Sequence, residues 1–155
     1  WCNCDENEFT GQYDLVFAHN THSIADFDTF MKMMNASRKY CFLCITARRS
    51  DEVMDSLRLI LRRGKVKNND SVAYIFDTIW LNGCNPEVAY EQVECKSKRT
   101  LEEAIPWYLE KLKEEKALSD EEEEKVVSFL SNVSVSGYVY ETIRTTLVNF
   151  FWKFN

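Results

Sequence analysis

The stretch Tyr13-Asp14-Leu15-Val16-Phe17-Ala18 decides the fold, and His19-Asn20-Thr21-His22 follows it directly. After Asp14 the run has no polar residue on either face, which predicts a strand covered on both sides by helices, as in a parallel sheet. Ligands of open α/β sheets bind beyond the carboxyl ends of the strands. The sequence therefore makes the loop at residues 19–22 the first candidate site.

The overall composition is that of one ordinary domain spanning residues 1–155. The chain is 45% hydrophobic and 14% aromatic, with a net charge of -6 and a pI near 5.0. An acidic average surface repels phosphate backbones and anionic lipids, which argues against nucleic-acid and membrane partners. With no apolar run of about 18 residues and no secretion signal, we expect a cytoplasmic protein. Because the sequence begins at Trp1 and not at Met, we also expect a longer natural chain.

Apolar spacing predicts the remaining elements. Three further strands and five helices are expected. The strands are Tyr40 to Thr46, Pro86 to Cys95 and Tyr140 to Phe154. The helices are Ala25 to Ser37, one capped by Ser50, one capped by Ser71 or Asp70 and ended by Asn82-Gly83, one opened by the capping box Thr100 to Glu103, and one opened by the capping box Ser119 to Glu122 and reaching Leu130.

The cysteines permit two interpretations. Cys41 and Cys44 have the spacing of a redox motif, but they lie within an apolar strand, which favours buried, inert thiols. Cys2 and Cys4 with His19 and His22 could supply four zinc ligands, although the spacing matches no common structural site. Unligated thiols and two loop histidines are the preferred interpretation, so no metal is predicted.

The arginines also permit two interpretations. Cations near the end of the second helix (Arg58, Arg62, Arg63 and Lys65) suit the helix dipole better than a phosphate site. Arg48 and Arg49 follow the second strand and either pair with Asp51 and Glu52 or bind an anionic substrate. The ion pairs are the preferred interpretation.

The order of these elements resembles the carboxyl-terminal half of a class I S-adenosylmethionine-dependent methyltransferase. The resemblance is carried by Tyr13-Asp-Leu-Val-Phe-Ala18, Lys39-Tyr-Cys-Phe-Leu43, Leu81-Asn-Gly-Cys84, Pro86-Glu-Val88 and the closing aromatic strand. It implies a Rossmann-like half-sheet, mostly parallel with an antiparallel last strand and with helices on both faces. The strands would lie in the order first, second, fourth, third, and residues 101–131 would be a helical insertion.

The resemblance also implies a site. Ala18, His19, Asn20 and Thr21 would border the cofactor S-adenosylmethionine, and His22 would act as a base if the methyl acceptor carries a proton. Two loop histidines that bond to nearby backbone are the alternative. The glycine-rich cofactor loop of the family is absent, because the four glycines stand far apart at positions 11, 64, 83 and 137. We therefore expect the chain alone to be inactive and not to bind S-adenosylmethionine; the methyl acceptor stays unknown.

A different class of function is an interaction module derived from the same fold. Without an upstream half, the Tyr13 to Ala18 strand lies at an open sheet edge, and an uncovered apolar edge pairs with other chains. This predicts a homodimer or larger oligomer formed through that strand.

Overall fold

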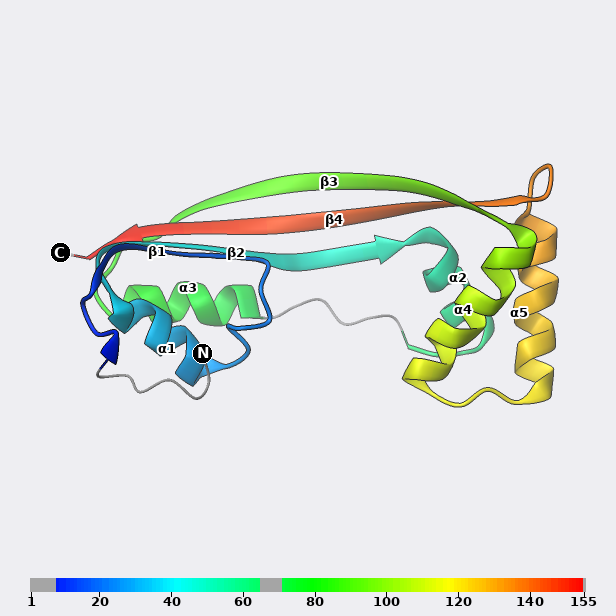
Figure 1. Ribbon diagram of the computed structural model, residues 1–155, viewed down its shortest axis with the longest axis horizontal. Coiled ribbons are helices and arrows are strands. Elements are labelled where there is room, and N and C mark those ends of the chain that lie inside the picture. The colour runs from blue at the N-terminus through cyan, green and yellow to red at the C-terminus, as the bar shows by residue number, and fades with distance from the viewer. Residues whose placement is uncertain (1–7, 65–70, 155) are drawn as a thin grey trace. The chain divides into compact units, whose positions relative to one another are not determined.

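The computed structural model describes residues 8–64 and 71–154, which form four strands and five helices (Figure 1). In chain order the elements are β1 (Tyr13–His19), α1 (Phe27–Ala36), β2 (Ser37–Asp51), α2 (Glu52–Ile60), α3 (Ser71–Leu81), β3 (Glu87–Thr100), α4 (Leu101–Glu115), α5 (Asp120–Val133) and β4 (Tyr138–Lys153). None of these helices combines the length and the apolar character that a bilayer crossing needs.

The four strands form one mixed sheet in the order β1-β2-β4-β3, which is the predicted order. β1 and β2 are parallel, with Val16 opposite Cys41 and Phe17 opposite Phe42. β4 runs against β2, because the Phe154 amide after the end of β4 donates to the Lys39 carbonyl near the start of β2 at 2.9 Å. The last strand is therefore inserted antiparallel between two earlier strands.

β3 and β4 are also antiparallel. The Thr146 hydroxyl donates to Gln92 at 3.3 Å, and the Ser97 hydroxyl donates to Glu141 at 3.4 Å. From the first pair to the second, the residue number increases along β3 and decreases along β4, so the two strands run in opposite directions. β2 and β3 are longer than their sequence patterns indicate, because polar residues continue each strand beyond its apolar run, whereas β4 lies close to its predicted range.

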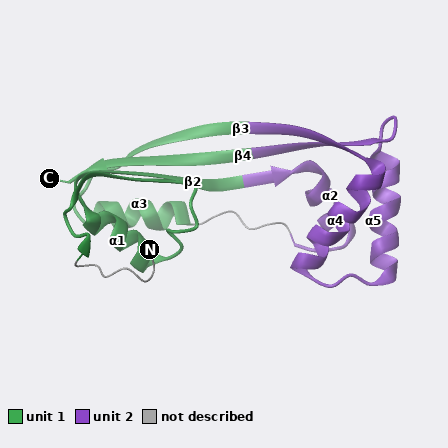
Figure 2. Cartoon of the chain, viewed as in Figure 1, with its two compact units in different colours: residues 1–48, 68–93, 145–155 green, residues 49–67, 94–144 purple. Residues whose placement is uncertain are grey.

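The chain divides into two compact units, coloured separately in Figure 2. Unit 1 comprises residues 1–48, 68–93 and 145–155, and unit 2 comprises residues 49–67 and 94–144. Each unit has a core of its own. The core of unit 1 joins α1 and α3 to alternate residues of β2 and β4, and that of unit 2 joins α2, α4 and α5.

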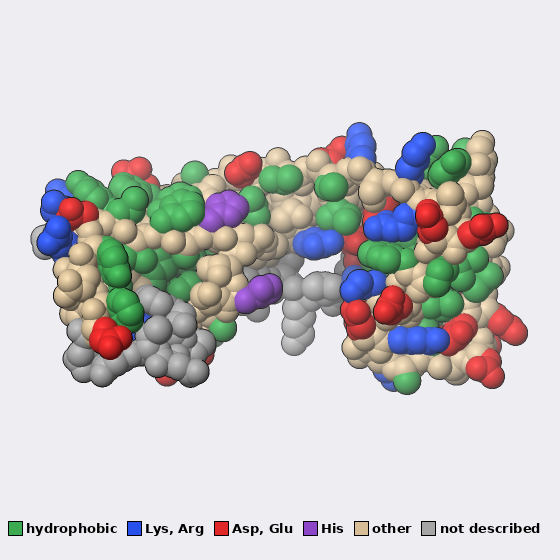
Figure 3. Space-filling model, in the orientation of Figure 1, with side chains coloured by type: hydrophobic (Ala, Val, Ile, Leu, Met, Phe, Trp, Pro, Cys, Tyr) green, Lys and Arg blue, Asp and Glu red, His purple; other side chains and the backbone are tan. Residues whose placement is uncertain are grey.

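In unit 1 the prediction of helices on both faces is wrong. α1 and α3 pack against the same face of the sheet, through Met33 and Ile79 among others (Figure 1). On the opposite face Tyr13 and Leu15 are exposed, and Phe17 is 61% exposed while it stacks on Phe42. Apolar residues occur on both buried and exposed faces, so a run without polar residues does not show whether both of its faces are covered. Figure 3 shows hydrophobic side chains gathered over the β1 and β2 part of unit 1.

Helix starts follow the sequence closely. Both predicted capping boxes are present, with the Thr100 hydroxyl accepting from the Glu103 amide and the Ser119 hydroxyl from the Glu122 amide. The predicted cap at Ser50 is wrong, because β2 continues through that residue and the Asp51 side chain accepts the Met54 amide at 3.0 Å. Asp70, the alternative cap of α3, lies outside the described residues.

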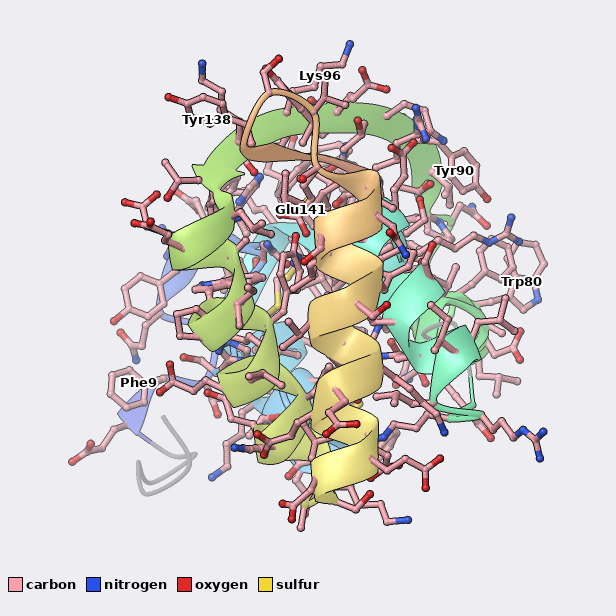
Figure 4. The ribbon with its side chains drawn as sticks, turned by 90° about the vertical axis from the view of Figure 1, so that its right-hand side faces the viewer. Phe9, Trp80, Tyr90, Lys96, Tyr138 and Glu141 are labelled. Atoms are coloured by element: carbon pink, nitrogen blue, oxygen red, sulfur yellow. The ribbon has the colours of Figure 1, made fainter. Side chains whose placement is uncertain are left out.

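A buried polar network lies in unit 2 around Glu141, which Figure 4 shows between α5 and the strands. The Tyr108 hydroxyl donates to Glu141 at 2.7 Å, and Arg99 forms an ion pair with Glu141 at 3.3 Å. The carboxyl groups of Asp51 and Glu141 also share a hydrogen bond. Burial and that bond raise the pKa of Asp51 to about 6, so between about pH 4 and pH 6 Asp51 keeps a proton that an ordinary aspartate would lose.

Candidate functional site

A cavity of about 760 Å³ lies in unit 1, just beyond the carboxyl end of β1. Its polar wall includes Asn20, Thr21 and His22 from the loop after β1, and Thr46 from β2. Its apolar wall includes Ile24, Phe30, Ile45 and Ile75. The cavity therefore combines an apolar floor with hydroxyl, amide and imidazole groups, which is the usual composition of a small-molecule site.

The loop after β1 is fixed by its own hydrogen bonds. Asn20 has a left-handed backbone with φ of 44°, a conformation that Asn tolerates better than most residues. Its amide donates to the Cys44 carbonyl at 2.8 Å, and its side-chain oxygen accepts the Thr46 hydroxyl at 3.0 Å. Asn20 thus ties the loop to β2 and positions Thr21 and His22 along the cavity wall.

Asp26 contributes the carboxylate of the cavity wall and begins α1. It accepts the Thr29 amide at 2.8 Å and the Thr29 hydroxyl at 2.7 Å. These bonds from Thr29 hold the pKa of Asp26 below its ordinary value, so the group is negatively charged at neutral pH. The start of α1 is already capped from within the chain.

Two aromatic side chains complete the lining, and both are largely solvent-exposed. Phe27 is 63% exposed and Tyr74 is 73% exposed. Phe27 has the three- and four-residue apolar spacing of its helix, which predicts a buried side chain, and that prediction is wrong. Phe27 is the first residue of α1, where a side chain can lie beside the core and still meet solvent.

The structure brings together only part of the predicted site. Asn20, Thr21 and His22 line the cavity, whereas Ala18 is buried in the core of unit 1. His19 is the last residue of β1, stacks on Phe17 with ring centroids 6.2 Å apart, and does not line the cavity. Of the four residues 19–22, the last three therefore line the cavity, while His19 lies beside Phe17 on β1.

Sequence reasoning missed Asp26, Phe27, Thr46 and Tyr74 as wall residues. Thr46 ends the apolar run of the neighbouring parallel strand, so it reaches the same sheet end as His19, and that signal was present in the sequence. Tyr74 carries no such signal. Its place depends on how α3 packs beside α1, which no local pattern specifies.

A second cavity of about 1180 Å³ in unit 1 lies where α3 faces β2, β3 and β4. Tyr90, Val148 and Phe150 line it together with Arg48 and Asp77. Arg48 therefore lines a surface away from the loop after β1. The predicted ion pairing of Glu52 with Arg48 or Arg49 is also wrong, because Glu52 pairs with Arg144 at 2.7 Å.

The remaining candidate groups are buried or are paired with other residues of the chain. Cys41 and Cys44 are both buried, and burial raises the pKa of Cys41 to about 12, which keeps that thiol protonated. Arg58 pairs with Asp55 and Glu115, and Arg63 donates to the Leu112 carbonyl at 2.9 Å near the end of α4.

The proposed zinc ligands cannot be assessed as a set, because Cys2 and Cys4 lie outside the described residues, as does Lys65 among the cations. Within residues 8–64 and 71–154, no three side chains of the metal-binding types come together.

Comparison with known proteins finds a likeness among solved structures. No protein-family model matches the chain, and no curated protein matches it. Among solved structures, the chain is similar to phosphoethanolamine N-methyltransferase 2 of Haemonchus contortus, solved in complex with phosphomonomethylethanolamine and S-adenosylhomocysteine. The TM-score is 0.39 and the identity 15%; the match covers 97% of this chain and 36% of that one. The chain thus spans about a third of the length of that protein.

Proposed function

We propose that this chain is the carboxyl-terminal part of an S-adenosylmethionine-dependent methyltransferase, with a Rossmann-like half-sheet. The observation that carries the proposal is the strand order β1-β2-β4-β3, with β4 inserted antiparallel between β2 and β3. The resemblance of the sequence to class I methyltransferases implies this order and this reversal. A strand that is last in the chain but lies inside the sheet distinguishes this fold from most others, because strands that are consecutive in the chain are usually neighbours in the sheet.

The residues of this chain do not by themselves fit S-adenosylmethionine. A nucleotide-type cofactor is held by a close glycine-rich turn and a helix start. The four glycines are too far apart to form such a turn, and the start of α1 is occupied by the Asp26 side chain. The proposal therefore assigns the cofactor-binding turn to a segment upstream of this sequence.

This chain supplies the acceptor side of the site in the proposal. Asn20 and Thr21 would border the methyl group, with Ala18 and His19 contributing backbone at the end of β1. His22 would accept the proton that the acceptor loses on methylation. S-adenosylmethionine would supply the methyl group as an electrophile, so the protein need only hold the acceptor in line and exclude water.

Calorimetry with S-adenosylmethionine tests the proposal. We expect no measurable binding by the 155-residue chain and clear binding by the protein that its complete natural reading frame encodes. Tight binding by the short chain would remove the need for an upstream turn. Absence of binding by the complete protein would overturn the methyltransferase assignment.

A second candidate function is an interaction module, favoured by the exposure of β1. This strand lies at one edge of the sheet, and its side chains Tyr13, Leu15 and Phe17 are exposed. Among the described strands none pairs with the outer edge of β1, and an edge beside an apolar surface promotes pairing with a second copy. We therefore propose self-association through Tyr13 to Ala18.

Self-association can be measured by sedimentation at micromolar concentration. We expect the chain to be dimeric or larger, and the Phe17→Lys protein to be monomeric under the same conditions, because a charged residue on an edge strand opposes pairing. Tyr90→Lys, on the opposite edge strand β3, is the control and should leave the association unchanged. A stable monomer of the original chain would contradict the proposal, as would equal effects of the two lysines.

A further inference from the structure

The charges around the cavity beyond β1 are unbalanced. Among the described residues that line it there is neither Lys nor Arg, and the one carboxylate is that of Asp26. Asp26 is ionised, as its bonds from Thr29 require. A ligand that carries a phosphate or carboxylate would meet no compensating cation on this wall, whereas a positive group would meet an opposite charge.

A helix start can replace a cation in binding an anion, but at the start of α1 a carboxylate of this chain, that of Asp26, already lies against the amides. The Thr29 amide donates to Asp26, and the Phe30 amide donates to the Asp26 carbonyl at 3.1 Å. The positive end of the helix dipole is thus already paired with the Asp26 carboxylate. Asp26 is the one carboxylate on the described lining, and its charge is partly offset by the bonds from Thr29 and by Lys32, which does not line the cavity.

Phe27 and Tyr74 supply the second requirement of a cation site. Their rings line the cavity and are largely exposed, so their faces can be covered by a ligand. Aromatic faces attract ammonium groups, by about 0.5–1 kcal/mol at exposed sites. Ile24, Ile45 and Ile75 give the same cavity an apolar part that would receive a hydrocarbon group.

We infer that this cavity binds a small organic cation, an amine or ammonium compound with an apolar portion and without phosphate or carboxylate, between the Asp26 carboxylate and the rings of Phe27 and Tyr74. Binding of the cation does not depend on methyl transfer. Only its identification as the methyl acceptor rests on the proposed function. In that case His22 would accept the proton that the bound ammonium must lose before its nitrogen can react. The new N–CH3 bond would then form as the S–CH3 bond breaks and S-adenosylhomocysteine leaves.

A charge series on one hydrocarbon frame tests the inference with the 155-residue chain. The probes are 2-phenylethylammonium, 2-phenylethanol and 3-phenylpropanoate, titrated into ¹⁵N-labelled protein without S-adenosylmethionine. We expect the ammonium to bind about tenfold more tightly than the alcohol, the sum of about 1.4 kcal/mol from ring and carboxylate. We expect the carboxylate to bind more weakly than the alcohol, and the shifted amides to be those near residues 20–27, 46 and 74.

Variants separate the cation site from general apolar binding. Asp26→Asn keeps a good helix cap but removes the charge, and Tyr74→Leu keeps an apolar side chain but removes the ring. Each should reduce the preference for ammonium over alcohol severalfold. Asp28→Asn, in the same first turn of α1 but not on the cavity wall, is the control and should leave the preference unchanged.

Three results would overturn the inference: equal affinities across the charge series, tighter binding of the carboxylate, or no binding of any probe at millimolar concentration. An unchanged preference in Asp26→Asn would also do so. A failure of the complete protein to bind S-adenosylmethionine would overturn the proposed function but leave the cation site standing, so the two tests fail separately.

Discussion

Phe150→Ala is expected to destabilise unit 1 by about 3–5 kcal/mol, enough to unfold a domain of ordinary stability. Phe150 is 0% exposed in β4, and its ring belongs to the core that joins β2 and β4 to α1 and α3. Truncation removes the buried ring and leaves a cavity that rigid neighbours cannot fill. Urea unfolding followed by amide signals from α1 and α3 gives the loss directly.

The neighbouring residue supplies a matched control. Phe151 is the same residue type in the same strand, but it is 37% exposed and lies beside Tyr40, with ring centroids 5.8 Å apart. Phe151→Ala should cost about 1 kcal/mol, because only a half-exposed ring contact is lost. Similar costs for both substitutions would mean that the structure has assigned the buried face of β4 incorrectly.

The second large effect is a loss of stability in unit 2 as the pH rises. The pKa of Asp51 is about 6 in the folded chain against an ordinary value of 3.8, so folding favours its protonated form. The stabilisation is fully present below the ordinary pKa and is lost as the pH rises through about 6. The shift corresponds to at most about 3 kcal/mol, since each unit is worth about 1.4 kcal/mol.

Asp51→Asn should remove this dependence, because the amide can still cap α2 but cannot ionise beside Glu141. The measurement is the free energy of unfolding of unit 2 between about pH 3.5 and pH 7, a range that spans the ordinary and the folded pKa of Asp51, followed by amide signals of α4 and α5. Glu52→Gln, an exposed carboxyl in the same helix, is the control and should keep the original pH profile. A profile in Asp51→Asn identical to that of the unmodified chain would contradict a shared proton between Asp51 and Glu141.

Local sequence patterns were sufficient for most helix starts, whereas the strand order was predicted from the resemblance to class I methyltransferases. The capping boxes at Thr100 and Ser119 were predictable because in each of them the capping residue and its glutamate partner lie within one helical turn. Ser50 failed as a cap because the pairing of β2 extended through it, a long-range effect. In the same way β2 extends beyond its predicted end at Thr46 to Asp51, and β3 beyond Cys95 to Thr100, because neighbouring strands continue the pairing.

The candidate site was predicted only on the side formed by the loop after β1, although Thr46 at the end of the neighbouring strand carried the same signal. Asn20 to His22 follow a strand, and the rule that ligands bind beyond strand ends located them. His19 was misplaced because it is still part of β1, where alternation turns its ring onto the exposed face with Phe17. Tyr74 and Phe27 depend on the packing of two helices over one face of the sheet, which a sequence read along the chain does not contain.

The most direct test of the central claim is amide chemical-shift mapping of S-adenosylmethionine in the protein encoded by the complete natural reading frame. Within residues 1–155 we expect the shifts to be concentrated at Ala18 to His22, with none along α5 in unit 2. Binding that leaves those five amides unshifted would contradict the assignment of this chain as the acceptor-side half of a methyltransferase.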